Sequence, residues 1–212
     1  MSDARRIAGR TKPPSTVRRT PTRGPQRAGI STGSIKRSGR RPSTLILVLG
    51  GAASGKSQAA LELAGEARPR AFVATGQALD QEMAGRIRRH QASRSPDWHT
   101  AEVPMDLGGW LRSRGSRYRT IVIDCLTLWL SNLQRNRVTD AAMPHRVGEL
   151  LDAICTTSAR VVLVSNELGL GLVPVSRAGR RFRDVAGKVH QQIATSADEV
   201  YFILAGRSLR VK

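Results

Sequence analysis

The chain has 212 residues, 35 of them Lys or Arg against 16 Asp or Glu, and a formal net charge of +19. A hydrophobic content of 40% is enough to form a core, and no apolar run approaches the roughly 18 residues that span a bilayer. The two cysteines, Cys125 and Cys155, form no CxxC pair or ligand cluster. This argues against a disulfide scaffold and a cysteine zinc site, and it fits a reducing cytoplasm.

Residues 1–42 contain twelve basic residues and a single acid, Asp3, together with many Pro, Ser and Gly and no aromatic residue. Such a segment cannot bury enough apolar surface to offset its ordering entropy, so we predict a disordered tail over 1–43 and a domain over 44–212. An arginine-rich arm could bind nucleic acid or anionic lipid, and the segment also resembles an organellar transit peptide. The alternative is an extension without a partner.

Structure is predicted to begin at the apolar run 45–49, which reads as a strand buried on both faces and stops at Gly50-Gly51. A helix is predicted next, over about 57–67. A short strand at 71–74 precedes a second helix over about 79–92, where the apolar stripe also carries His90. The further predicted elements are strands at 120–124 and 161–165, helices at 126–133, 141–155 and 177–195, and closing strands at 199–204 and 209–212.

Apolar strands that alternate with helices predict an α/β fold with a mostly parallel sheet covered on both faces. Ligands of such folds bind at the carboxyl ends of the strands. The loops at 50–56, 75–78, 124–127 and 165–176 are therefore the places to search for a site.

A phosphate-binding loop is the strongest motif. The sequence G-x-x-x-x-G-K-[ST] is matched between a strand and a helix by Gly50, Gly51, Ala52, Ala53, Ser54, Gly55, Lys56 and Ser57. Its backbone N–H groups and the helix N-terminus suit phosphate oxygens, Lys56 suits the β- and γ-phosphates, and the Ser57 hydroxyl suits Mg²⁺. The motif predicts binding of a nucleoside triphosphate and says nothing about the reaction.

Two further residues have alternative interpretations. Asp124 ends an apolar strand, where it could hold Mg²⁺ or simply cap the next helix. His90 could be an ordinary rim histidine on an apolar stripe, although Arg86 on the same side suggests a nearby anion. His190 is expected on the polar side of its helix, and no histidine pairs with a Cys or an acid at zinc-ligand spacing.

The motifs together closely resemble one family, over about residues 45–212. It is the bifunctional adenosylcobinamide kinase / adenosylcobinamide-phosphate guanylyltransferase of cobalamin biosynthesis. The segments that carry the resemblance are the phosphate loop, Val73-Ala74-Thr75-Gly76-Gln77, Arg86-Ile87-x-x-His90, Trp98-x-Thr100-x-Glu102, Asp124–Leu133 and Asn166-Glu167-x-Gly169-x-Gly171-x-Val173-Pro174.

The resemblance implies a three-layer P-loop NTPase-type (RecA-like) domain that assembles as a homo-oligomer, a trimer in relatives. It implies phosphorylation of the aminopropanol hydroxyl of adenosylcobinamide by ATP or GTP. GMP transfer from GTP through a guanylyl-histidine then yields adenosylcobinamide-GDP. It assigns catalysis to His90 and Lys56, Mg²⁺ to Ser57 and Asp124, and further nucleotide contacts to Thr75, Gly76, Gln77, Gln91, Ala92, Ser93, Arg94, Glu102 and Asp124.

The chain departs from the family pattern at two places. The segment Gln91–Arg94 lacks the glycine that commonly follows the histidine, and Ala53 stands where members commonly have arginine. Two other functions remain open at this point. One is a nucleic-acid-binding phosphate-loop protein that uses the tail as an arm, which would bind with strong salt dependence. The other is a kinase-only relative, in which His90 has no role. Neither nucleic acid nor a membrane is required by the main interpretation.

Overall fold

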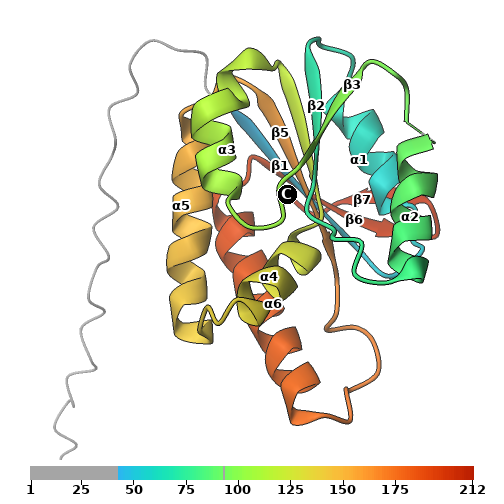
Figure 1. The fold of residues 1–212 in the computed structure, drawn as a ribbon, viewed down its shortest axis with the longest axis vertical. Helices are drawn as coiled ribbons and strands as arrows, with labels where there is room; N and C mark the ends of the chain where they lie inside the picture. The colour runs from blue at the N-terminus through green and yellow to red at the C-terminus, as the bar shows by residue number, and fades with distance from the viewer. Residues whose placement is uncertain (1–42, 93) are drawn as a thin grey trace, which may run out of the picture. The chain divides into compact units, whose positions relative to one another are not determined.

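The computed structural model describes residues 43–92 and 94–212, so the predicted tail, apart from Ser43, lies outside the described residues. Within them, seven strands form one sheet in the order β3-β2-β4-β5-β1-β6-β7 (Figure 1). The strands are β1 (Thr44–Gly50), β2 (Arg70–Ala74), β3 (Trp98–Glu102), β4 (Thr120–Asp124), β5 (Arg160–Asn166), β6 (Glu199–Leu204) and β7 (Arg207–Arg210). All neighbours are parallel except β6 and β7, which confirms the mostly parallel sheet.

Helices cover both faces of this sheet, which makes the three layers expected of the fold (Figure 1). On the described residues the helices are α1 (Lys56–Ala64), α2 (Gln81–Ala92), α3 (Leu107–Arg114), α4 (Leu126–Arg135), α5 (Met143–Cys155) and α6 (Arg177–Ser196), with 3₁₀ turns η1 (Gly115–Arg117) and η2 (Asp140–Ala142). None of them is both long and apolar enough to cross a membrane.

The sheet has two cores because its central strands are apolar on both sides. In β1, Leu45 and Leu47 pack with residues of α3, α4, α5 and α6, whereas Ile46 and Val48 pack with α1 on the opposite face. Alternate side chains of a strand point to opposite faces, so a continuous apolar run is what a doubly covered strand requires. This packing fixes the carboxyl ends of β1, β4 and β5 at one edge of the sheet.

The order of three central strands matches the RecA-like type. β5 lies between β1, which leads into the phosphate loop, and β4, which ends in Asp124. In register, Gly50 of β1 pairs with Asn166 of β5, and Asp124 of β4 pairs with Val164. The loop and the acid therefore lie at the same edge, one strand apart.

Two elements are absent from the sequence-based prediction. β3 lies at the sheet edge, where only Trp98 of its five residues is buried, so it lacks an apolar run. α3 contains two glycines, which weaken helix formation. Its first turn is stabilised by Asp106, whose side chain accepts a hydrogen bond from the Gly109 N–H at 2.8 Å, and its buried Leu107 and Leu111 attach it to the core.

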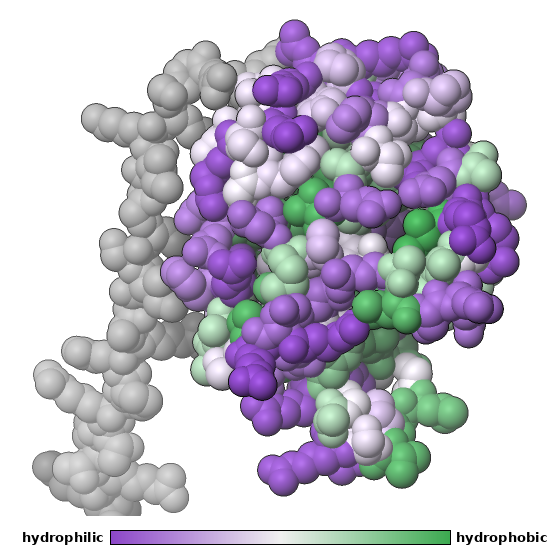
Figure 2. Space-filling view, viewed as in Figure 1, coloured by the Kyte–Doolittle hydropathy of each residue, from purple (hydrophilic) through white to green (hydrophobic). Residues whose placement is uncertain are grey.

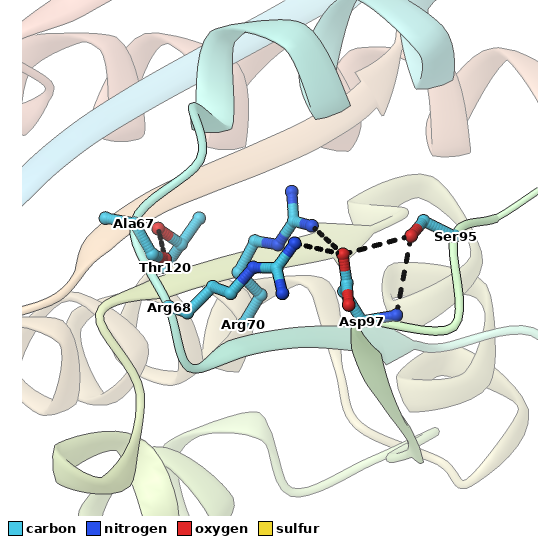
Figure 3. Close-up of polar contacts among 6 residues, drawn as sticks. All are labelled: Ala67, Arg68, Arg70, Ser95, Asp97 and Thr120. Carbon is cyan, nitrogen blue, oxygen red and sulfur yellow. Dashed lines mark hydrogen bonds and ion pairs between the residues drawn. The ribbon is translucent and has the colours of Figure 1, made fainter.

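The amino-terminal end of β3 is held beside β2 by a polar cluster around Asp97 (Figure 3). Arg70 donates to the Asp97 carboxylate at 3.0 Å, Arg68 also pairs with it, and the Ser95 hydroxyl lies 3.2 Å away. The Arg70 guanidinium also lies over the Trp98 ring at 4.9 Å. These contacts compensate for the small apolar area that an edge strand can bury.

The prediction for His190 is wrong. The residue is only 6% exposed, because the buried face of α6 is wider than one stripe and includes Ala186 one turn before it. The other boundaries differ by small amounts. α1 ends at Ala64 because Gly65 follows with a positive φ of 75°, and β7 spans Arg207–Arg210 rather than 209–212.

The core between the sheet and α4 provides a test of the fold. Leu130 is fully buried, so Leu130→Ala is expected to lower the free energy of unfolding by about 3 kcal/mol through lost packing and a cavity. Leu209→Ala, at a site 63% exposed, is the matched control and should cost less than about 1 kcal/mol. Urea denaturation measures both, and equal losses would contradict the assigned burial.

Candidate nucleotide-binding site

The phosphate loop connects β1 to α1 and needs glycine at two positions. A Cβ on Gly50 would lie 2.6 Å from the Ser54 hydroxyl oxygen and 2.8 Å from the Ile203 carbonyl oxygen. Gly55, just before α1, has φ 89°, a conformation that side chains disfavour. The sequence therefore allows the tight turn that brings backbone N–H groups and the N-terminus of α1 to one place.

The loop is anchored from two sides. The Glu167 N–H, just after β5, donates to the Gly50 carbonyl at 2.9 Å. The Gly206 N–H, in the turn between β6 and β7, donates to the Ser54 carbonyl at 2.9 Å. Both bonds satisfy carbonyl groups of the loop, so they restrain its backbone from opposite ends.

Lys56 places a buried cation at the start of α1. The side chain is 7% exposed, and its Nζ donates to the Gly51 carbonyl at 3.2 Å. This is the one protein acceptor that Nζ has among the described residues. A lysine ammonium carries three donors, and a buried cation is stable only when it is paired. The remaining donors therefore favour an anionic ligand.

Lys56 lines a pocket of about 130 Å³ at the carboxyl ends of the strands. Hydrophobic residues from β2, α2 and α4 share it with cationic, acidic and polar ones. The pocket is lined by Lys56, Ser57, Phe72, Ala74, Gly76, Met83, Ile87, Arg94, Asp124, Cys125, Leu128 and Asn166. The apolar walls suit the flat base of a nucleotide, and the two cations of the lining suit its charged phosphates.

Thr75 is hydrogen-bonded to the backbone at the end of β4. Its hydroxyl donates to the Cys125 carbonyl at 2.7 Å and accepts from the Cys125 N–H at 2.9 Å, and its own N–H donates to the Asp124 carbonyl at 3.2 Å. The peptide bond between Asp124 and Cys125 is cis. Because Thr75 is fully buried, its side chain supports the backbone that carries Asp124 and does not itself line the pocket.

Arg94 closes the pocket on the side of β2 and β3. Its guanidinium lies 3.8 Å from the centre of the Phe72 ring and donates to the Thr100 hydroxyl at 3.2 Å. Burial lowers the pKa of Arg94, and the Asp124 carboxylate acts in the opposite direction. A guanidinium stacked on an aromatic ring offers a planar, positively charged surface.

The predicted site residues fall into two groups. Lys56, Ser57, Gly76, Arg94 and Asp124 come together around one pocket. The others lie in adjoining segments that do not line it. Among these, Gln77, Gln91, Ala92 and Glu102 are exposed, Thr75 is buried, and Ser93 lies outside the described residues.

His90 lies in the last turn of α2 (Gln81–Ala92), three residues beyond Ile87, which lines the pocket. Its backbone therefore lies one helical turn beyond the part of α2 that lines the pocket. Sequence reasoning did not assign Phe72 or Asn166 to the site. Asn166 follows a predicted buried strand directly, so the rule that ligands bind at strand ends could have found it.

Comparisons with known proteins agree with this arrangement. Residues 46–211 match the profile of the family described as "Cobinamide kinase / cobinamide phosphate guanyltransferase". The chain belongs to this family. It is 44% identical to the "Bifunctional adenosylcobalamin biosynthesis protein CobP" of Pseudomonas aeruginosa, over 78% of the chain and 96% of that protein. It is 36% identical to the "Bifunctional adenosylcobalamin biosynthesis protein CobU" of Escherichia coli, over 79% of the chain and 99% of that protein.

Solved structures resemble this family member more distantly. A KaiC-like protein from Pyrococcus horikoshii is 16% identical, with a TM-score of 0.45 over 76% of this chain and 71% of its own. The P4 protein of bacteriophage phi6 is 14% identical, with a TM-score of 0.45 over 82% of this chain and 59% of its own.

The two cysteines provide a test of the pocket. Burial and the neighbouring Asp124 carboxylate raise the pKa of Cys125 to about 11, so at pH 8 only about a thousandth of this thiol is the reactive thiolate. Cys155 is exposed. Iodoacetamide at pH 8 is expected to alkylate Cys155 and to leave Cys125 unmodified, as read by mass spectrometry of tryptic peptides. Alkylation of both at the same rate would contradict the burial of Cys125.

Proposed function

We propose that this chain phosphorylates the aminopropanol hydroxyl of adenosylcobinamide with ATP or GTP, and then transfers GMP from GTP to the new phosphate to give adenosylcobinamide-GDP. The observation that carries the proposal is a single pocket in a member of this family. There the phosphate-loop residues Lys56 and Ser57 lie with Asp124 beside α2, the helix that contains His90. One nucleotide site would serve both half-reactions.

The phosphate loop supports the phosphoryl transfer. Backbone N–H groups of residues 50–57, the N-terminus of α1 and the Lys56 ammonium can bind the β- and γ-phosphates and neutralise the charge that develops on them. The corrinoid hydroxyl would attack the γ-phosphorus, and the nucleoside diphosphate would leave. Catalysis of this kind depends mainly on positioning and electrostatic stabilisation, which a rigid anchored loop supplies.

The residues present also fit a magnesium ion. Ser57 and Asp124 bring a hydroxyl and a carboxylate oxygen to the same pocket as Lys56, and hard cations such as Mg²⁺ take oxygen ligands. A bound Mg²⁺ would supply charge neutralisation on the phosphates. In this proposal Ser57 and Asp124 would hold the ion and Lys56 would bind the phosphates.

The guanylyl transfer is assigned to His90. A neutral imidazole nitrogen would attack the α-phosphorus of GTP, form a phosphoramidate and expel pyrophosphate. The phosphate oxygen of adenosylcobinamide phosphate would then attack the same phosphorus and release the imidazole. Support comes from the position of His90 on α2, one turn beyond Ile87 in the pocket wall.

Other residues are proposed to bind the guanine nucleotide. Arg94 stacked on Phe72 offers a platform for the base, and Gly76 allows close approach at the pocket wall. Exposed positions in adjoining segments are proposed to add contacts once a nucleotide is bound, while Thr75 acts through the backbone of Asp124. The exposed positions are Gln77, Gln91, Ala92 and Glu102. Ser93, which lies outside the described residues, is proposed to contact the nucleotide with them.

We further propose that the working domain spans 44–212, that the tail over 1–43 is not required for it, and that the enzyme acts in the cytoplasm. The family match over residues 46–211 supports the boundaries. Both cysteines of the chain are free thiols, which fits a reducing compartment.

The division of labour between His90 and Lys56 is testable by product analysis with adenosylcobinamide and GTP. His90→Ala is expected to lower formation of adenosylcobinamide-GDP by about a hundredfold or more while adenosylcobinamide phosphate accumulates, because only the second step needs a covalent intermediate. Lys56→Ala is expected to lower both steps by about a hundredfold or more, because both use the bound phosphates.

His145→Ala is the matched histidine control, since this side chain is 79% exposed on α5, and it should leave both rates unchanged. Formation of adenosylcobinamide-GDP by His90→Ala at the parental rate would overturn the guanylylation assignment. A kinase-only enzyme would form adenosylcobinamide phosphate and no adenosylcobinamide-GDP with either parent or variant.

A homo-oligomer is also proposed, supported by the segment between β5 and α6. This segment projects at the bottom of the view, where Figure 2 shows hydrophobic surface. Four of its apolar side chains are 64% to 98% exposed. They are Leu170, Leu172, Val173 and Val175. A cluster of this kind on a surface usually marks an interface, and a second copy of the chain is the occupant that the family resemblance favours.

Light scattering after size-exclusion chromatography tests the oligomer. The parent is expected at a multiple of 23.0 kDa, with three copies as the expected number. The double variant Leu172→Asp, Val175→Asp should shift toward the single-chain mass, because burial of unpaired carboxylates is costly. Leu209→Asp, at another exposed leucine, should not shift. If the parent protein is monomeric at a test concentration of about 10 µM, the proposal is contradicted.

A further inference from the structure

A chain of hydrogen bonds between buried side chains leads from α6 to the nucleotide pocket. On α6, His190 Nε2 lies 2.8 Å from the Ser165 hydroxyl oxygen, and that oxygen lies 3.0 Å from the Thr127 hydroxyl oxygen. Thr127 Oγ1 in turn accepts a hydrogen bond from the Asn166 backbone N–H at 2.9 Å. All three side chains are less than 9% exposed, so the chain runs through the protein interior from α6 to the end of β5.

The far end of this chain reaches the pocket. Asn166 lines the pocket and pairs in register with Gly50, the first residue of the phosphate loop. The next residue, Glu167, donates its backbone N–H to the Gly50 carbonyl at 2.9 Å. Three consecutive residues, 165–167, therefore connect the buried histidine to the backbone that cradles phosphate.

His190 itself is an unusual residue for this position. Its Nδ1 is buried and has no hydrogen-bond partner among the described residues, and Glu167 Oε2 lies 3.8 Å from it. Burial lowers the pKa of His190, while the Glu167 carboxylate, the charged group that faces it among the described residues, acts in the opposite direction. An apolar side chain would fill such a site without leaving a buried polar atom unpaired, so the polar contact to Ser165 needs a reason.

We propose that His190 is a positioning residue of the nucleotide site, which acts through Ser165 and Thr127 to hold Asn166 at the pocket wall and Glu167 against the phosphate loop. This inference rests on the proposed function, because it assumes that the pocket binds a nucleotide. Small displacements of groups that orient a substrate have large effects on its binding and reaction.

Binding of a fluorescent GTP analogue to the full chain tests the proposal. His190→Leu fills the site but removes the bond to Ser165, and it is expected to raise the Kd about tenfold. His190→Gln places an amide nitrogen near the position of Nε2, so its Kd should stay within about twofold of the parent. Ser165→Ala removes the same bond with a smaller change in volume, and it serves if His190→Leu does not fold.

The double variant His190→Leu, Ser165→Ala should bind no more weakly than the worse single variant, since both act through one chain. Ile193→Ala is the structural control. Ile193 lies on the same helix, is fully buried and takes no part in these hydrogen bonds. Its substitution by Ala is expected to lower the melting temperature without changing the Kd. A loss of affinity in Ile193→Ala equal to that in His190→Leu would reduce His190 to a packing role and overturn the proposal.

Parental affinity in both His190→Leu and Ser165→Ala would also overturn it, while leaving the proposed function intact. Lys56→Ala distinguishes failure of the positioning role alone from failure of the nucleotide site itself. If the parent does not bind the analogue, or if Lys56→Ala binds it as well as the parent does, the nucleotide site itself is wrong and the positioning role is wrong with it.

Discussion

A buried lysine is the constraint on which the site depends. Lys56 is 7% exposed, and among the described residues its ammonium has one protein acceptor, the Gly51 carbonyl. The fold tolerates this charge because α1 starts where strand ends converge, with the Asp124 carboxylate in the same pocket. Phosphate oxygens would satisfy the remaining N–H donors. The loop glycines, the strand order and the anchoring bonds from Glu167 and Gly206 all keep this cation in place.

The same edge of the sheet brings two kinds of chemistry together. β1 leads into the phosphate loop, and β4 ends in Asp124. The helix α2, which follows β2 in the chain, forms another wall of the pocket through Met83 and Ile87. His90 lies on this same helix, and in the proposed function a nucleotide in the pocket presents its γ-phosphorus to the corrinoid hydroxyl in one step and its α-phosphorus to His90 in another. Membership of the cobinamide kinase / cobinamide phosphate guanyltransferase family is consistent with this double use.

Sequence reasoning succeeded where physics leaves a local signature. The apolar runs of β1, β4 and β5 and the glycine pattern of the phosphate loop are readable because strand burial and tight turns restrict residue types. It failed where stability comes from distant partners. β3 is held by Arg70 of the neighbouring strand, α3 by Leu107 and Leu111 packed in a core shared with distant helices, and the buried His190 contacts Ser165 and Glu167 at the end of β5. None of these pairings can be recognised from a single segment.

Labelling with GTP tests the central claim, that one pocket serves both a phosphate loop and a histidine nucleophile. The parent chain is incubated with GTP labelled on the α-phosphate and with GTP labelled on the γ-phosphate, in parallel, and digested after denaturation. The account predicts an acid-labile, base-stable adduct from the α-label alone, on the α2 peptide that contains His90, and no adduct in Lys56→Ala. Absence of the adduct in the parent, or its location on another residue, would contradict the account.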